Sequence, residues 1–156
     1  MDIIIEIDNL NFNQVIFNSP IPNSIIENGL FNRICYSTSD ISMSGLNIFF
    51  KLEDYKIEKF YNKFKINYEI DKNHVVINKL INIEKKILSK INIRNKSPIY
   101  KLSDNFLTKN IKINQFLNNS KGICLKISGI WQTKNNFGLT FRFQQANVYK
   151  IPLNHQ

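Results

Sequence analysis

The clearest pattern in the chain is a pair of alternating arms in its last third, over 122–133 and 139–151. In each arm apolar residues take one face of an extended strand and polar residues take the other. The apolar positions are Leu125, Ile127 and Trp131, then Leu139, Phe141 and Phe143. The opposite positions are Lys126 and Ser128, then Thr140, Arg142 and Gln144. With Asn and Gly at 134–138, the pattern predicts a β-hairpin, and Gly129 predicts a bulge or bend in its first arm.

Shorter strands are predicted in the part of the chain that precedes this hairpin. Alternation or short apolar runs mark them at 3–7, 12–17, 31–37, 45–52, 64–70, 99–102 and 111–113. Pro20 and Pro22 remove two backbone donors and restrict φ, so 19–23 is predicted to be a turn.

One segment has the periodicity of a helix. In 73–91 the residues Val76, Leu80, Ile83 and Ile87 follow the spacing of one helix face, and lysines occupy the other side. Asn73 or Asn78 is a candidate N-cap, and Pro98 lies beyond the end of the helix.

The order of these elements predicts a mainly β chain with one helix, organised as a single domain over 1–156. A five-stranded OB-fold-like barrel has its helix between strands 3 and 4 and ends on a hairpin of strands 4 and 5. The helix at 73–91 followed by the hairpin at 122–151 fits that plan, although other small β-rich domains share the same order.

Charge is distributed unevenly along the chain. The 21 Lys and Arg residues outnumber the 12 Asp and Glu residues, for a net charge of +9. Residues 1–50 carry −4, residues 51–100 carry +6, and residues 101–156, with Asp104 as the single acid, carry +7. A solvated, lysine-rich surface produced by A/T-rich codon usage is the alternative explanation. Because codon bias does not remove acids from a third of the chain, the charge favours a polyanion as partner.

Two classes of protein are disfavoured by the sequence. No apolar run reaches the roughly 18 residues of a membrane span, and the acidic start lacks the basic flank of a signal peptide. Cys35 and Cys124 indicate a reduced thiol pair rather than a disulfide framework. We therefore expect a soluble, intracellular protein.

Signatures of catalysis are missing as well. The chain has no GxxxxGK[ST], GxGxxG, HExxH or GxSxG motif and no CxxC pair. Glu53 and Asp54 are the only adjacent acids, whereas a metal-dependent nuclease needs several convergent carboxylates. We expect no enzymatic activity, no cofactor and no metal.

Rings and lysines alternate between positions 51 and 68. Cations neutralise phosphates while flat rings stack on bases, which is how single strands are held. Lys51, Lys63 and Lys65 are therefore candidate phosphate contacts, and Tyr61 is a candidate stacking ring. The alternative is that Phe64 faces the core while the lysines point into solvent.

The polar face of the terminal hairpin is cationic and carries no acid. Lys126 and Arg142 are candidate phosphate contacts, and Arg33 is a third, because a guanidinium both pairs with phosphate and stacks on a base. The candidate stacking rings in these segments are Tyr36, Trp131 and Phe137. Trp131 alternates with core residues, so core filling is its alternative role, whereas Phe137 beside the turn is expected to be exposed.

The segments 122–131 and 137–143 resemble the closing hairpin of viral single-stranded-DNA-binding proteins of the OB-fold kind, found in phages and large eukaryotic DNA viruses. The segments 33–36, 45–50 and 81–88 are similar in kind and order. The resemblance implies an OB fold that acts in DNA replication, recombination or repair. Many of those proteins end in an acidic tail that recruits replication partners, whereas no acid follows Asp104 in this chain.

The sequence thus predicts a non-catalytic module that binds single-stranded DNA without sequence preference, with RNA as the alternative ligand. Replication proteins and a second copy of the chain are further candidate partners, and a membrane is not. A viral protein of this kind would act in the host cytoplasm or nucleus. The alternative from another class is a structural or assembly protein, such as a virion component, with an incidental basic surface.

Overall fold

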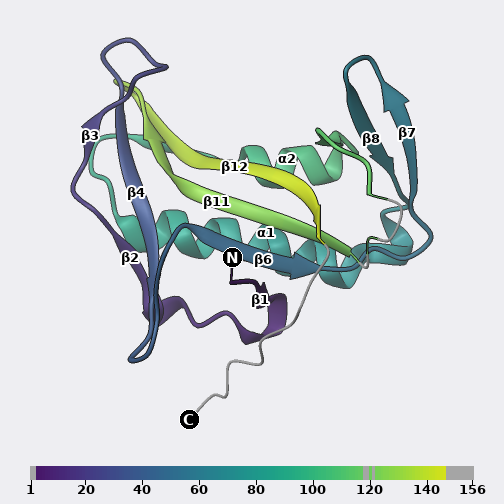
Figure 1. Cartoon of the computed structure of the whole chain (residues 1–156). Coiled ribbons are helices and arrows are strands. Elements are labelled where there is room, and N and C mark those ends of the chain that lie inside the picture. Colours follow the sequence, from purple (N-terminus) through teal and green to yellow (C-terminus); the bar gives the residue numbers. More distant parts are fainter. Residues whose placement is uncertain (1–2, 118–119, 121, 147–156) are drawn as a thin grey trace.

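A long hairpin of two strands forms the centre of the protein (Figure 1). In the computed structural model, which describes residues 3–117, 120 and 122–146, β11 (Gly122–Gln132) and β12 (Asn136–Ala146) pair antiparallel along their length. On its other side β11 has two antiparallel partners in succession. β6 (Leu46–Phe50) pairs with its first half and β4 (Leu30–Ser37) with its second half. β11 is therefore a central strand with neighbours on both sides.

Short strands extend this sheet to nine strands. One runs parallel to β6, one runs parallel to the start of β12, and three pair antiparallel with β4. In that order they are β1 (Ile5–Glu6), β9 (Ser97–Ile99), β2 (Val15–Phe17), β3 (Ile21–Pro22) and β5 (Ser42–Ser44).

A second sheet stands at one end of the molecule. Its three antiparallel strands lie in the order β10 (Ile111–Ile113), β8 (Lys63–Asn67) and β7 (Lys56–Phe60). The hairpin of β7 and β8 projects beyond the body of the protein (Figure 1).

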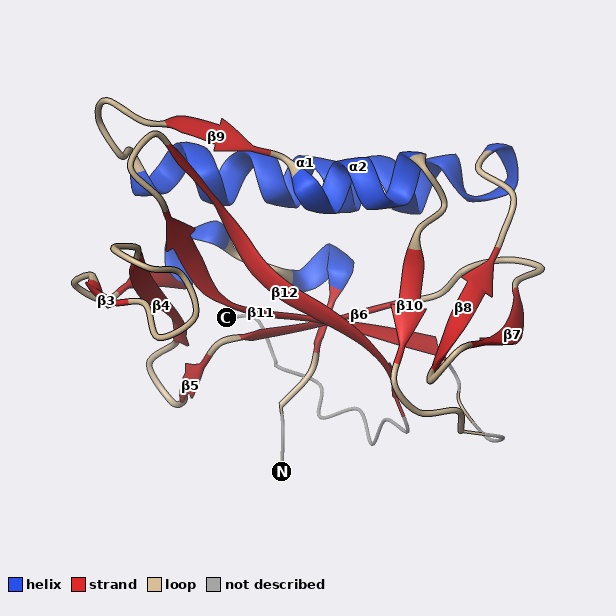
Figure 2. Cartoon of the chain, turned by 90° about the horizontal axis from the view of Figure 1, so that it is seen from above, coloured by secondary structure: helices blue, strands red, loops and turns tan. Residues whose placement is uncertain are grey.

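Two helices, α1 (His74–Ile91) and α2 (Lys101–Leu107), lie along one face of the main sheet (Figure 2). The apolar stripe of α1 is buried in the core, with Leu80 and Ile87 completely covered. Because each buried Ile or Leu contributes about 1.5–3 kcal/mol, this stripe explains why the whole segment stays helical. Three short 3-10 turns complete the elements: η1 (Ile7–Asn9), η2 (Phe12–Gln14) and η3 (Asp71–Asn73).

One apolar core joins the helices to both sheets. It includes Ile48 and Leu125 from the main sheet, Ile66 from the second sheet, Ile83 from α1 and Phe106 from α2. Side chains from both sheets and both helices therefore share the main buried cluster, and Phe49, Cys124 and Ala146 form a second, smaller one.

Several predictions of local structure are confirmed. The chain is mainly β with one long helix, α1, and the helix predicted over 73–91 begins at His74 and ends at Ile91. The long hairpin is present, and its pairing register shifts between Ile127 and Gly129, as a bulge requires. The strands that we describe form an open main sheet and a separate three-stranded sheet rather than a closed barrel. The predicted end of the second arm, 147–151, lies outside the described residues.

The short strand predicted over 99–102 is wrong in its second half, where the helix α2 begins at Lys101. The reason is a tertiary contact from α1. The fully buried carboxylate of Glu84 accepts hydrogen bonds from the backbone N–H of Leu102 (2.9 Å), from that of Ser103 (2.8 Å) and from the Ser103 hydroxyl (2.6 Å). A carboxylate there satisfies donors that the first helical turn leaves free.

Candidate nucleic-acid interface

The face of the main sheet that points away from the helices carries the polar side chains of the long hairpin; we call it the outer face. Residue pairs that meet across the strands define it. Lys126 lies opposite both Arg142 and Asn47, and Trp131 lies opposite both Gly138 and Phe31. The side chains of the outer face on β4, β6, β11 and β12 are Phe31, Arg33, Cys35, Asn47, Phe49, Cys124, Lys126, Trp131, Thr140, Arg142, Gln144 and Ala146. Of these, Asn47, Phe49, Cys124 and Ala146 are buried, and Ile4 packs against the last three.

The bulge decides where Trp131 lies. Simple alternation would place it on the same face as Leu125 and Ile127, which are buried in the core. Because the bulge inserts one residue between Ile127 and Gly129, Ile130 takes the core position and Trp131 turns to the outer face, where it is half-buried. The core-filling alternative for Trp131 is therefore wrong.

Three rings of the outer face lie directly over glycines: Phe49, over Gly122, is buried, and the other two, Phe31 and Trp131, are half-buried. A Cβ at Gly138 would stand 2.8 Å from Trp131 Cζ2 and 2.9 Å from the carbonyl oxygen of Ile99. A Cβ at Gly129 would overlap the Phe31 ring and the carbonyl oxygen of Asn32. Only glycine leaves room for an aromatic ring this close to a neighbouring strand. The two rings are thus held at fixed positions on the sheet.

Three cations share the outer face: Arg33 and Arg142 are exposed and Lys126 is half-buried. Lys126 and Arg142 lie directly opposite each other on neighbouring strands, where like charges are destabilising. The strands β4, β6, β11 and β12 contain no Asp or Glu; Glu6 of β1 lies at the edge, opposite Phe49, and has an interaction of its own. Among the described residues none of the three cations forms an ion pair, and Arg33 Nη1 donates a hydrogen bond to Ser44 Oγ at 3.4 Å. An anion bound here would relieve the repulsion.

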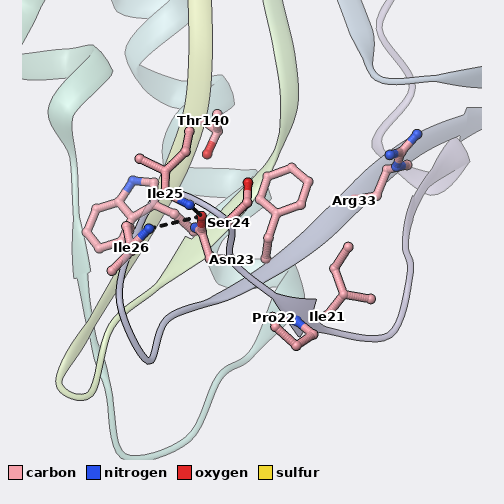
Figure 3. Close-up of a pocket in the computed structure, with 10 residues that line it drawn as sticks. Ile21, Pro22, Asn23, Ser24, Ile25, Ile26, Arg33 and Thr140 are labelled. Carbon is pink, nitrogen blue, oxygen red and sulfur yellow. Dashed lines mark hydrogen bonds between the residues drawn. The ribbon is translucent and has the colours of Figure 1, made fainter.

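A pocket of about 480 Å³ opens on the outer face beneath the loop between β3 and β4 (Figure 3). The sheet contributes Phe31, Arg33, Trp131 and Thr140, and the other lining residues are Ile21, Pro22, Asn23, Ser24, Ile25 and Ile26. A second, more polar pocket of about 270 Å³ lies beside Arg142 and Gln144, next to the segment that follows β10. Both pockets border cations of the same face.

The second sheet presents another basic surface, which we call the hairpin surface. Tyr61 in the turn belongs to it, and the strands contribute Lys56, Glu58, Phe60, Lys63, Lys65, Asn67 and Lys112. Glu58, directly opposite Lys65, is its one acid among these residues. Tyr61, in the turn, is 84% exposed, and its ring meets that of Phe60 edge-on at 4.8 Å. Lys112 Nζ lies 4.6 Å from the centre of the Phe60 ring, a cation–π distance. Phe64, by contrast, packs against the core from the opposite face of β8, in agreement with the alternative for that ring.

The base of this hairpin is fixed by buried and exposed contacts. Tyr68, just after β8, donates a hydrogen bond from its hydroxyl to the carbonyl oxygen of Phe106 at 2.7 Å, and burial raises its pKa to about 12. Lys72 pairs with Asp54 at 3.2 Å, and this hydrogen bond raises the pKa of the lysine. Asn73, the predicted cap of α1, instead bridges three backbone groups of Glu53 and Glu69.

The structure sorts the predicted contact residues into three groups, with Lys51 apart from all of them. Arg33, Lys126, Trp131 and Arg142 come together on the outer face, and Tyr61, Lys63 and Lys65 come together on the hairpin surface. Lys51 is exposed directly after β6. Tyr36 and Phe137 make up the third group, which is buried.

Tyr36 and Phe137 are corrections to the sequence prediction. Tyr36 is 2% exposed, and its hydroxyl oxygen accepts a hydrogen bond from the backbone N–H of Asn11 at 3.2 Å. Phe137, predicted to be exposed, is 4% exposed, because β12 starts at Asn136 and Phe137 continues the core face of Leu139 and Phe143. Neither ring offers a face to a base.

Sequence reasoning missed Phe31 and the loop after β3. Phe31 stands two residues before Arg33, and on a strand that spacing places both side chains on the same face. The turn predicted over 19–23 is wrong at Ile21–Pro22, which form the strand β3. Nothing local indicated that the next segment, 23–29, would fold over Trp131.

Other kinds of site are not found in the described part of the chain. There, no group of three or more His, Cys, Asp or Glu side chains is placed to hold a metal ion, and no helix is long and apolar enough to cross a membrane. Cys35 is half-buried and Cys124 is buried. No protein-family model, curated protein sequence or solved structure matches the chain.

Proposed function

We propose that the protein binds single-stranded DNA without sequence preference, as a non-catalytic component of DNA replication, recombination or repair. One observation carries the proposal: two rings seated on glycines lie beside three cations, on four strands that contain no acid. Fixed rings, and cations that form no ion pair with the described residues, match the two features of a single strand, its flat bases and its phosphates.

The division of roles follows from chemistry. Arg33, Lys126 and Arg142 would hold successive phosphates, and Trp131 would stack on a base, a contact worth about 1–3 kcal/mol for any base. The hairpin surface would extend the path with Lys63, Lys65 and Tyr61. Because none of these contacts reads the edge of a base, binding would tolerate any sequence.

The proposal includes the resemblance to viral OB-fold single-strand-binding proteins. In its support, the long helix α1 precedes a closing hairpin that begins at Gly122 and bends at Gly129. The open main sheet would then be a departure from a five-stranded barrel, with β4 and β6 sharing one side of β11.

The test is the binding of fluorescently labelled oligo-dT, measured by anisotropy at two salt concentrations, with duplex DNA and oligo-U in parallel. We expect tighter binding of the single strand and a loss of affinity with salt of about 0.7 log units per log unit for each phosphate contact. Arg142→Glu should weaken binding at least tenfold.

Lys85→Glu is the matched control, because Lys85 is exposed on α1, away from the outer face. If both variants weaken binding equally, the outer face contributes to binding only through the overall positive charge of the protein. Absence of salt-sensitive binding in the wild type, together with oligomers that persist without DNA, would favour a structural or assembly protein instead.

A further inference from the structure

The pocket under the loop between β3 and β4 has a composition that sets it apart from the rest of the outer face. Most of its walls are apolar, with isoleucines from the loop on one side and the rings of Phe31 and Trp131 on the sheet. Arg33 is its only charged lining residue, and Ser24 and Thr140 supply hydroxyls. Figure 3 shows Ile25 and Thr140 toward one side of the pocket and Arg33 toward the other. The pocket therefore suits a flat, largely apolar group joined to an anion.

The loop is built to hold its shape without a ligand. The side-chain oxygen of Asn23 accepts hydrogen bonds from the backbone N–H groups of Ile25 (2.9 Å) and Ile26 (3.3 Å). The backbone of Asn23 is bonded to the carbonyl of Gly29 at 2.9 Å, and the N–H of Gly29 donates to Ile26 at 3.0 Å. A wall braced in this way is preorganised, which lowers the entropy lost on binding.

Two apolar side chains border the pocket, Ile25, which is exposed, and Trp131, which is half-buried. Ile25 is 92% exposed at the tip of the loop. The indole of Trp131 lies with Cζ2 and Cε2 over Gly138, and the same side chain lines the pocket. A base placed here would cover both side chains at once. The volume of about 480 Å³ falls within the range of small-molecule sites and admits one nucleotide, not a double helix.

We infer that this pocket receives a single base of the bound strand, turned out of the base stack onto Trp131, with its phosphate on Arg33. The inference rests on the proposed function and adds a site to it: Lys126 and Arg142 bind the backbone along the sheet, and the pocket captures one nucleotide beside them. Since Trp131 is the only tryptophan of the chain, its fluorescence reports on this site alone.

The experiment uses the full chain and two small probes, thymidine 5′-monophosphate and deoxyribose 5-phosphate, which lacks the base. We expect saturable quenching of Trp131 by the first probe and none by the second. Ser24→Phe places a ring in the mouth of the pocket from an exposed loop position, and Ser89→Phe makes the same change on the exposed side of α1. Ser24→Phe should abolish the quenching by thymidine monophosphate and weaken oligo-dT binding about tenfold, whereas Ser89→Phe should change neither.

The outcomes separate this inference from the proposed function. If oligo-dT binds both variants as it binds the wild type, and the mononucleotide does not quench Trp131, the pocket is not a base site although the outer face binds DNA. Equal quenching by the probe that lacks a base would also overturn the inference. If oligo-dT binds no form of the protein, the proposed function fails and the inference fails with it.

Discussion

The outer face and the hairpin surface both combine cations with aromatic rings, but they hold the rings in opposite ways. On the outer face Phe31 and Trp131 lie over glycines of neighbouring strands, and the sheet beneath them is packed against α1 and the core. On the hairpin surface Tyr61 stands in a turn that projects from the body, at a φ of +54°. A side chain at positive φ is strained, and glycine is the residue that such a position favours.

The difference indicates distinct contributions to binding. Rings seated over glycines in a packed sheet need no ordering before they meet a ligand, so the outer face should supply most of the affinity. Exposed lysines on a projecting hairpin lose more freedom when they bind, so the hairpin surface should contribute mainly long-range attraction.

The largest expected effect comes from removing the same number of charges from each surface. Lys126→Ala with Arg142→Ala should weaken oligo-dT binding about fiftyfold, whereas Lys63→Ala with Lys65→Ala should weaken it about fivefold. Each double variant should lower the salt slope by about 1.4 if both side chains contact phosphates. Anisotropy titrations over a salt series measure both quantities. Equal losses of affinity would remove the distinction between the two surfaces.

The second prediction concerns the seat of Trp131. In Gly138→Ala the new Cβ would meet the indole and the backbone oxygen of Ile99, so the free energy of unfolding should fall by about 2 kcal/mol and the emission of Trp131 should shift. Urea unfolding and emission spectra measure the two effects. Asn136→Ala on the same strand is the control. An unchanged emission spectrum would show that the ring does not depend on this glycine.

A third prediction concerns the anchor of the hairpin. Tyr68→Phe removes the hydrogen bond to Phe106 and should lower the free energy of unfolding by about 1 kcal/mol at pH 8. Because the pKa of Tyr68 is about 12 in the folded chain and 10 in the unfolded chain, its contribution is complete below pH 10 and is lost as the pH rises toward 12.

The difference between wild type and Tyr68→Phe should therefore shrink between pH 10 and 12, which urea titrations at several pH values would reveal. A difference that stays constant over that range would contradict the raised pKa.

The smallest effect is expected at the tip of the hairpin. Tyr61→Gly relieves the strain of positive φ but adds freedom to the unfolded chain, so stability should rise by only about 0.5 kcal/mol. The same change should weaken oligo-dT binding by a few fold because a stacking ring is lost. Thermal unfolding measures the change in stability, and anisotropy titrations measure the change in affinity for oligo-dT. A loss of stability instead would mean that the contact of Tyr61 with Phe60 outweighs the strain of the backbone.

The sequence by itself determined the features that depend on local periodicity. The apolar stripe of α1, the two arms of the long hairpin and the place of Lys126 and Arg142 opposite the core all follow from spacing. Each of these patterns extends over enough residues to distinguish the periodicity of a helix from that of a strand. The sequence also located the bulge at Gly129, although it did not reveal which face of the sheet the side chains after the bulge would occupy.

Only the tertiary structure decided the rest, because it depends on contacts between distant segments. The bulge turned Trp131 to the outer face, and the pairing of β4 with β11 brought Phe31 and Arg33 beside it. Glu84, which belongs to α1, stabilises the first turn of α2 by accepting a hydrogen bond from Leu102, 18 positions further along the chain. Tyr36 became a core residue because alternation does not tell which of two faces the rest of the protein will cover. Phe137 became one because β12 begins at Asn136, inside the segment predicted to be the turn.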